Sequence, residues 1–190
     1  SGLSGINLSR IDGVTITNVH VRNCVYDGLQ LSSHPPDKAN DSWVDDGWIT
    51  QAVIRELQSY HNGQWGLSLN GSLLPVGPQL GATFQDCWFT RNMGQCNIEN
   101  NAESKYPYEV SVRFTGCHFN DGESEVTPGE SGGFGFSFGS SGTSLSLVST
   151  LDFQDCEFAR NQVHMWFAPG VHPVLGYRTQ FNPVRFLGCR

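Results

Sequence analysis

Short segments with alternating apolar and polar residues recur along the whole chain, and this period of two is typical of β-strands. Six of them share one form, with apolar side chains at the second and fourth positions. They are Gly5-Ile6-Asn7-Leu8, Gly28-Leu29-Gln30-Leu31, Gly66-Leu67-Ser68-Leu69, Gln95-Cys96-Asn97-Ile98, Gly135-Phe136-Ser137-Phe138 and His164-Met165-Trp166-Phe167. We call them the glycine-led strands. Because successive side chains of a strand point to opposite faces, the third residue of each is predicted to point outward.

Pairs of still shorter apolar segments lie between the glycine-led strands, and a two-residue polar corner separates the two members of each pair. The corners are Thr17-Asn18, Arg55-Glu56, Gln85-Asp86, Thr115-Gly116, Gln154-Asp155 and Leu187-Gly188. The extra residues that make the repeats unequal fall mainly after the glycine-led strands, at 32–50, 70–81, 99–109, 139–149 and 168–178. A fixed unit with variable insertions indicates stacked repeats. The sequence therefore predicts one all-β domain over residues 1–190, of about five coils with three short strands each and long loops on one side.

This combination of three strands per coil, a tight polar corner and a glycine-led strand resembles the right-handed parallel β-helix of the pectin lyase-like superfamily. The resemblance extends over nearly the whole chain, although the motif in each coil is short. It is similar to the bodies of phage tailspikes and polysaccharide depolymerases. The resemblance implies an extended polysaccharide bound on the outer face of the glycine-led strands.

The stacking predicts a column of inward side chains directly after the corners, formed by Val19, Leu57, Cys87, Cys117, Cys156 and Cys189. A small apolar thiol suits such a position, while side chains that point in parallel suit a disulfide poorly. We therefore expect reduced core cysteines. The chain has no CxxC pair, so a zinc site is not expected.

Composition narrows the classes of partner. Glycine is frequent at 22 residues, charged residues make up 15% and the net charge is −7. An acidic chain disfavours nucleic acid as a partner, and no apolar run is long enough to predict a membrane span. The sequence begins and stops within a coil, so we expect a fragment of a longer chain, with its ends covered by neighbouring chain segments or in a homotrimer.

The outward residues and the turns next to them supply the candidate binding residues. The outward row consists of Asn7, Gln30, Ser68, Asn97, Ser137 and Trp166, of which Gln30, Asn97 and Trp166 are predicted to bind substrate. The turns add Asp27, His61, Trp65 and Arg91. Amides hydrogen-bond sugar hydroxyls and an indole stacks on a sugar ring, but a solvated strand face has the same polar alternation.

The insertion at residues 32–50 carries the densest cluster of acidic and aromatic residues, including Trp43, Asp45, Asp46 and Trp48. These residues could supply an acid, a base and stacking platforms for a sugar. They could also bind calcium through oxygen ligands, although the spacing is not that of an EF-hand. A solvated turn is the third interpretation.

Glycosidic hydrolysis requires two carboxyl groups about 5–10 Å apart, and two strand spacings span about 9.6 Å. Asp27 with Asp45 or Asp46, and Glu99 one or two coils along, are therefore the predicted catalytic residues. A lyase would instead use a base and a charge neutraliser, for which His61 and Arg91 are candidates. The calcium-binding aspartates and catalytic arginine of pectate lyases have no clear match here, and neither do the paired aspartates of polygalacturonases.

Three functions remain open at this point. The first is a carbohydrate-active β-helix that binds and cleaves a long surface polysaccharide, as a glycosidase of the tailspike type. The second is a non-catalytic structural or adhesive β-helix, and the third is a secreted polysaccharide lyase or epimerase. Each of them predicts an extracellular protein or one on a virion surface. The sequence does not predict which polysaccharide is bound.

Overall fold

The computed structural model describes residues 4–9, 11–32, 48–100, 108–122, 133–140, 146–168, 180–181 and 184–190. These residues form three parallel β-sheets and contain no helix. Sheet A holds β1 (Ile6–Ser9), β4 (Leu29–Ser32), β7 (Trp65–Asn70), β11 (Gly94–Asn100), β14 (Phe134–Ser140) and β17 (Val163–Ala168). The glycine-led strands are thus confirmed as strands of a single sheet.

The other two sheets contain the paired segments. Sheet B holds β2 (Asp12–Thr17), β5 (Trp48–Arg55), β8 (Ser72–Leu74), β9 (Ala82–Gln85), β12 (Tyr108–Thr115), β15 (Ser146–Gln154), β18 (Gln180–Phe181) and β19 (Arg185–Leu187). Sheet C holds β3 (His20–Arg22), β6 (Gln58–Tyr60), β10 (Trp88–Thr90), β13 (His118–Asn120) and β16 (Glu157–Ala159).

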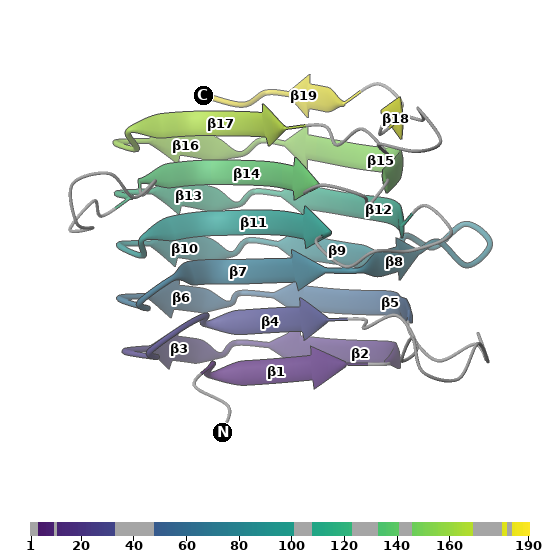
Figure 1. Cartoon of the computed structure of the whole chain (residues 1–190), viewed down its shortest axis with the longest axis horizontal. Helices are drawn as coiled ribbons and strands as arrows, with labels where there is room; N and C mark the ends of the chain where they lie inside the picture. Colours follow the sequence, from purple (N-terminus) through teal and green to yellow (C-terminus); the bar gives the residue numbers. More distant parts are fainter. Residues whose placement is uncertain are drawn as a thin grey trace.

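The chain passes through the sheets in a fixed order, from B to C to A, and then returns to B one level further along the stack (Figure 1). We call one such passage a coil. Within each sheet the strands follow one another in sequence order and pair in parallel, as with β7 between β4 and β11. This all-β arrangement of three parallel strand stacks is consistent with a parallel β-helix.

Phenylalanines of successive coils stack on one another in the core. Phe84, Phe114, Phe153 and Phe186 form one stack, with ring centroids 4.9, 5.2 and 5.0 Å apart along it. A second stack, through Phe119, stands edge-on to the first, with Phe114 and Phe119 5.4 Å apart at 79°. Parallel, in-register strands place equivalent residues directly above one another, so a residue repeated in every coil becomes a continuous stack.

The corner between sheets B and C has a left-handed backbone conformation in every coil. Asn18, Glu56, Asp86 and Asp155 have φ between 51° and 55°, and Gly116 and Gly188 occupy the same place with φ of 62° and 65°. Glycine, asparagine and aspartate tolerate this conformation better than other residues. The residues of the polar corners therefore permit the backbone turn that takes the chain from one sheet into the next.

The predicted cysteine column is present and lies directly after this corner. Cys87, Cys117 and Cys156 are buried, Cys189 is partly exposed, and all four are free thiols. Each thiol donates a hydrogen bond to the carbonyl two residues earlier, as from Cys117 to Thr115 at 3.5 Å. Burial raises the pKa of the Cys117 thiol well above its ordinary value. The column thus adds hydrogen bonds as well as apolar volume to the corner.

Buried asparagines tie the coils together at the corner between sheets C and A. The side-chain oxygen of Asn92 accepts the backbone N–H of Asn62 at 3.0 Å, and Asn62 accepts the N–H of Cys24 in the same way at 3.1 Å. A Cβ at Gly28 would collide with Ser59 Oγ and lie 2.7 Å from the Asn62 amide. This close approach explains the glycine that opens the strand.

The loops of the structure are shorter than the loops predicted from the sequence, so the predicted loop boundaries were wrong. Ile49, Leu73 and Val148 fall within them, yet each is fully buried in sheet B. Ile49 pairs with Leu73, and Leu73 and Val148 both pair with Val110. Cross-coil pairing and burial therefore extend the strands into segments whose local pattern indicates turns. The remainder of the expected loops lies mostly outside the described residues, apart from the excursion at 75–81 between β8 and β9.

No helix among the described residues has the length and apolar character needed to cross a membrane.

Candidate functional site

The predicted outward row on sheet A is in register across all six strands. Asn7 pairs with Gln30, Gln30 with Ser68, Ser68 with Asn97, Asn97 with Ser137 and Ser137 with Trp166. The middle of the row is nevertheless buried, because Ser68, Asn97 and Ser137 are each only 4% exposed. The exposed ends of the row are Asn7 and Trp166, and Gln30 is partly exposed. The predicted binding roles of Gln30 and Asn97 stay predictions.

Three aromatic side chains form a strip that ends in this row, at Trp166. Trp65 stacks on Phe134, with centroids 6.3 Å apart at 27°, and Phe134 lies 5.9 Å from Trp166. Trp65 spans an intervening coil because Gly94 leaves its side-chain space empty, and a Cβ there would collide with the indole. Trp166 is 46% exposed at the end of the strip. We call these three residues the aromatic strip; it contains two of the four predicted tryptophans, Trp65 and Trp166.

Asp27, a predicted catalytic carboxylate, lies at the entrance to sheet A. It is 6% exposed, and its Oδ1 accepts the backbone N–H of Trp65 in the next coil at 3.1 Å. That bond holds the turn before β7 against the turn before β4. In this structure Asp27 therefore has a clear role in connecting two coils, and its catalytic role stays a prediction.

His61 and Arg91 occupy equivalent positions of neighbouring coils, at the corner between sheets C and A. The N–H of His61 donates to the carbonyl of Arg91 at 3.0 Å, and both side chains are exposed. Asn23, Asp121 and Arg160 complete this column, and all five residues have φ between 53° and 57°. The structure thus brings these two candidate residues into neighbouring coils, and their binding and catalytic roles stay predictions.

The remaining predicted residues are not fully described. Trp43, Asp45 and Asp46 lie outside the described residues. Trp48 and Glu99 belong to strands, with Trp48 paired to Ser72 and Glu99 to Gly139, but their side chains lie outside the described part. Trp48 was expected in a loop, and its place in β5 is a second correction. The proposed pairing of Asp27 with Asp45, Asp46 or Glu99 therefore stays a prediction.

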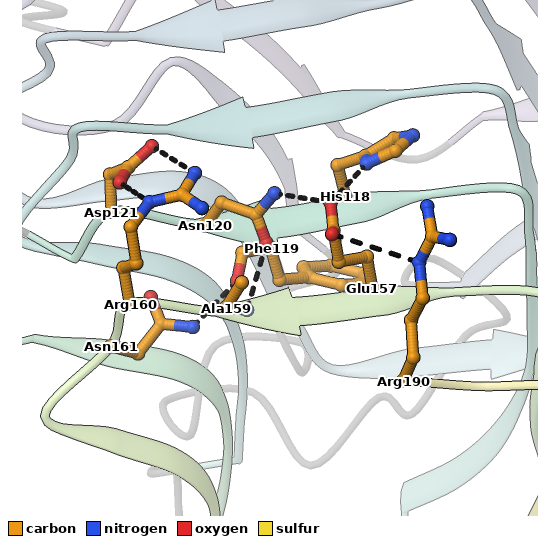
Figure 2. Close-up of polar contacts among 9 residues, drawn as sticks. All are labelled: His118, Phe119, Asn120, Asp121, Glu157, Ala159, Arg160, Asn161 and Arg190. Atoms are coloured by element: carbon orange, nitrogen blue, oxygen red, sulfur yellow. Dashed lines mark hydrogen bonds and ion pairs between the residues drawn. The ribbon is translucent and has the colours of Figure 1, made fainter.

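A polar cluster that the sequence analysis missed lies on the outer face of sheet C (Figure 2). His118 Nδ1 lies 2.8 Å from Glu157 Oε2, which also accepts a 2.8 Å hydrogen bond from the Asn120 amide. Arg190 Nε is 3.7 Å from the other carboxylate oxygen. The hydrogen bonds from His118 and Asn120 lower the pKa of Glu157. An ionised carboxylate can only accept, so Nδ1 of His118 is the donor in this pair.

The geometry of the cluster fixes the imidazole on several sides. Asn120 is itself anchored, since its side-chain oxygen accepts the N–H of Ala159 at 2.9 Å. The His118 ring lies flat against Trp88, with centroids 5.4 Å apart at 5°. Figure 2 shows the second ring nitrogen of His118 directed away from Glu157. That nitrogen is able to accept a hydrogen bond or a proton from a ligand.

A signal for this pair was present in the sequence. His118 follows Cys117 and Glu157 follows Cys156, so aligning the cysteines of successive coils also aligns His118 with Glu157. The same reasoning places Arg190 next to Glu157. Equivalence between coils is therefore a better guide to polar partners in this chain than separation along the sequence.

A second charged group lies on the outer face of sheet B. Asp152 accepts hydrogen bonds from Arg113 at 3.0 Å and from Arg185 at 2.8 Å, on the two neighbouring strands. This group pairs its charges across three coils and is best understood as a structural tie. Among the described residues, no three His, Cys, Asp or Glu side chains are grouped to hold a metal ion. The calcium hypothesis for residues 32–50 rests on residues that the structure does not describe.

Comparison with models of known protein families, with curated proteins and with solved structures found no match.

Proposed function

We propose that the chain is a right-handed parallel β-helix, similar to the pectin lyase-like superfamily, that binds a long polysaccharide along the outer side of sheet A. In such a protein the stacked coils provide a rigid surface parallel to the bound polymer. The observation that carries the proposal is the aromatic strip of Trp65, Phe134 and Trp166. Aromatic rings beside amide groups are the usual means of recognising a sugar, which has both apolar faces and hydroxyl groups.

Binding is favoured over cleavage by the state of Asp27, the one predicted carboxylate whose side chain the structure describes. Asp27 is buried and holds the N–H of Trp65, so in this arrangement it would not reach a sugar as an acid. A stable adhesive or tailspike-like surface requires only the polymer contacts. An extracellular or virion-surface location is part of the same proposal.

The test is binding of the full chain to an array of neutral polysaccharides, followed by affinity electrophoresis with those that bind. Trp166→Ala should weaken binding about tenfold, because removal of one aromatic contact with a sugar costs about 1.4 kcal/mol. Leu187→Ala is the matched control, since Leu187 is also exposed in the last coil but belongs to sheet B. Unchanged binding in Trp166→Ala, or an equal loss in the control, would contradict the proposal.

A second candidate is a polysaccharide lyase, which the adjacency of His61 and Arg91 favours. The imidazole would take a proton from a sugar carbon, and the guanidinium would stabilise the negative charge that develops. The glycosidic C–O bond on the adjacent carbon would then break to form the C=C double bond, and the leaving oxygen would take a proton from water. Absorbance of an unsaturated product tests this activity. His61→Ala should abolish it and His20→Ala should not, because His20 is exposed on sheet C away from that corner. Product formation that survives His61→Ala would rule out this assignment.

A further inference from the structure

The outer face of sheet C differs in charge from the rest of the molecule. We define the sheet C face as the outward side chains of its strands, the residue that follows each strand, and Arg190. It carries four arginines, Arg22, Arg91, Arg160 and Arg190, but only two carboxylates, Asp121 and Glu157. Two positive charges are therefore in excess on this face, while the chain as a whole has a net charge of −7.

The two carboxylates of the face are already neutralised within it. Asp121 pairs with Arg160, whose Nη2 lies 3.0 Å from Oδ2, and the hydrogen bond from Arg160 lowers the pKa of Asp121. Glu157 is bonded by His118 and Asn120. Arg91 adds a weaker attraction to Asp121, and Arg22 lies 6.0 Å above the Tyr60 ring. Both Arg22 and Arg91 are exposed, so their charge is presented to the solvent.

The backbone at Arg91 and Arg160 supports a role for these side chains. Both have a left-handed φ, of 53° and 56°, a conformation that costs a residue other than glycine, asparagine or aspartate about 1 kcal/mol. Asn23 and Asp121 fill the same position in other coils at less cost. The backbone of the corner therefore does not require arginine, so the presence of arginine there is explained by the interactions of its side chain.

Trp88 marks the centre of the same face. It is 38% exposed although sheet C continues on both sides of it, through β6 and β13. The other exposed large apolar side chains of the described residues lie in turns, in the 75–81 excursion or in the last coil. The exposure of Trp88 is thus not caused by a turn or by the end of the stack. An exposed aromatic side chain among arginines suits a ligand with both apolar surface and negative charge.

We propose that the sheet C face is a second binding surface, and that its ligand is an acidic polysaccharide. The arginines select the charge of the polymer, and Trp88 with His118 contacts the sugar rings and hydroxyls. Arg22 and Arg91 are two coils apart, on β3 and just after β10, which is about 9.6 Å by the spacing of strands in a sheet. They can therefore hold successive acidic groups of a chain that runs parallel to the stack.

The opposite edge of sheet C orients the ligand. Glu56, Asp86 and Asp155 lie at the corner between sheets B and C and give that edge a negative charge. An acidic polymer is repelled there and held along the opposite edge, where Arg22 and Arg91 lie. The same negative edge, together with the net charge of the chain, disfavours a nucleic acid, whose phosphates form a denser array of charge.

The experiment compares two double variants with the same change in net charge. The probes are polygalacturonate as the acidic polymer, dextran as the neutral one and a single-stranded oligonucleotide, all at low ionic strength, where surface charges are least screened. Arg22→Gln with Arg91→Gln should weaken polygalacturonate binding about tenfold, at about threefold for each exposed arginine. Arg55→Gln with Arg113→Gln, on sheet B, should weaken it no more than twofold. Trp88→Ala should also weaken it, while Trp166→Ala should not.

Several outcomes would overturn the proposal. Equal losses in the two double variants would mean that net charge alone attracts the polymer. Failure of the unaltered protein to bind polygalacturonate would exclude the site, and oligonucleotide binding with the same response to the variants would identify a nucleic-acid face instead. The sheet A proposal is tested separately, because it predicts dextran-type binding that responds to Trp166→Ala and not to Arg22→Gln. If Trp88→Ala does not fold, the two arginine variants still decide the question.

Discussion

The phenylalanine stack permits a quantitative test of how the coils support one another. Phe114 is fully buried at the centre of the stack, between Phe84 at 4.9 Å and Phe153 at 5.2 Å. Phe119 and Phe136 meet it edge-on at 5.4 and 6.2 Å. Phe186 belongs to the same stack but is 44% exposed and touches only Phe153 within it. The two positions therefore provide the same side chain with and without full enclosure.

Replacement of Phe114 by alanine should cost about 5 kcal/mol of unfolding free energy. Removal of a buried phenylalanine costs about 3–5 kcal/mol, and the four ring contacts place Phe114 at the upper end of that range. Phe186→Ala should cost about 1–2 kcal/mol, because the side chain is half exposed and loses one ring contact. Phe114→Leu keeps most of the volume and should fall between the two, at about 3 kcal/mol.

The assay is denaturation in urea, followed by far-ultraviolet circular dichroism and by tryptophan fluorescence. Coincidence of the two curves tests whether all coils unfold together, and an unchanged slope shows that the variant exposes the same area. Losses for Phe114→Ala and Phe186→Ala that agree within about 0.5 kcal/mol would refute the reasoning. Such agreement would mean that enclosure by neighbouring rings does not determine the cost.

Three further predictions concern other parts of the stack. Asn92→Ala should cost about 3 kcal/mol in the same urea assay, because Asn92 bonds Asn62, Ser59 and Gln95 in a buried setting, whereas exposed Asn7→Ala should cost little. His118 lowers the pKa of Glu157 and Arg160 lowers the pKa of Asp121, so their contribution to stability is full above the unfolded pKa values of about 4.3 and 3.9 and is lost on acidification. Melting temperatures measured from about pH 3 to 7 should therefore decline less in Glu157→Gln and Asp121→Asn than in the unaltered protein. An unchanged decline would contradict the assignment. Burial raises the pKa of the Cys96 and Cys117 thiols, so native alkylation followed by mass spectrometry should label partly exposed Cys24 and Cys189 first, and early labelling of Cys117 would show that the column is open.

The strand stacks were predictable because one local pattern repeats. Apolar residues at Leu67 and Leu69 recur at Cys96 and Ile98, and the structure pairs them in that register. A shift by one residue would turn the apolar side chains outward, so the pattern permits a single alignment. The polar corner was recognisable for a similar reason, since few residues accept its left-handed backbone.

The site was less predictable, because exposure depends on what lies above a strand as well as on its pattern. Ser68 and Asn97 alternate outward as expected, yet both are buried. Gly94 has no side chain, and the space that this leaves lets Trp65 reach Phe134. No local sequence pattern predicts that contact. The pairing of His118 with Glu157 joins residues of different coils, so it emerges only after the coils are aligned.

The cysteine column implies that the repeat itself does not determine the number of coils. Leu57, Cys87 and Cys117 occupy the same place in three coils, and each carbonyl accepts the N–H of the residue after its counterpart. Excision of residues 87–116 would join Asp86 to Cys117, seat β13 on β6, and allow the same parallel strand pairing in a molecule one layer shorter. Duplication of the same cassette would lengthen it. The height of the protein, and with it the length of its outer faces, could thus change by whole layers through simple genetic duplication or loss.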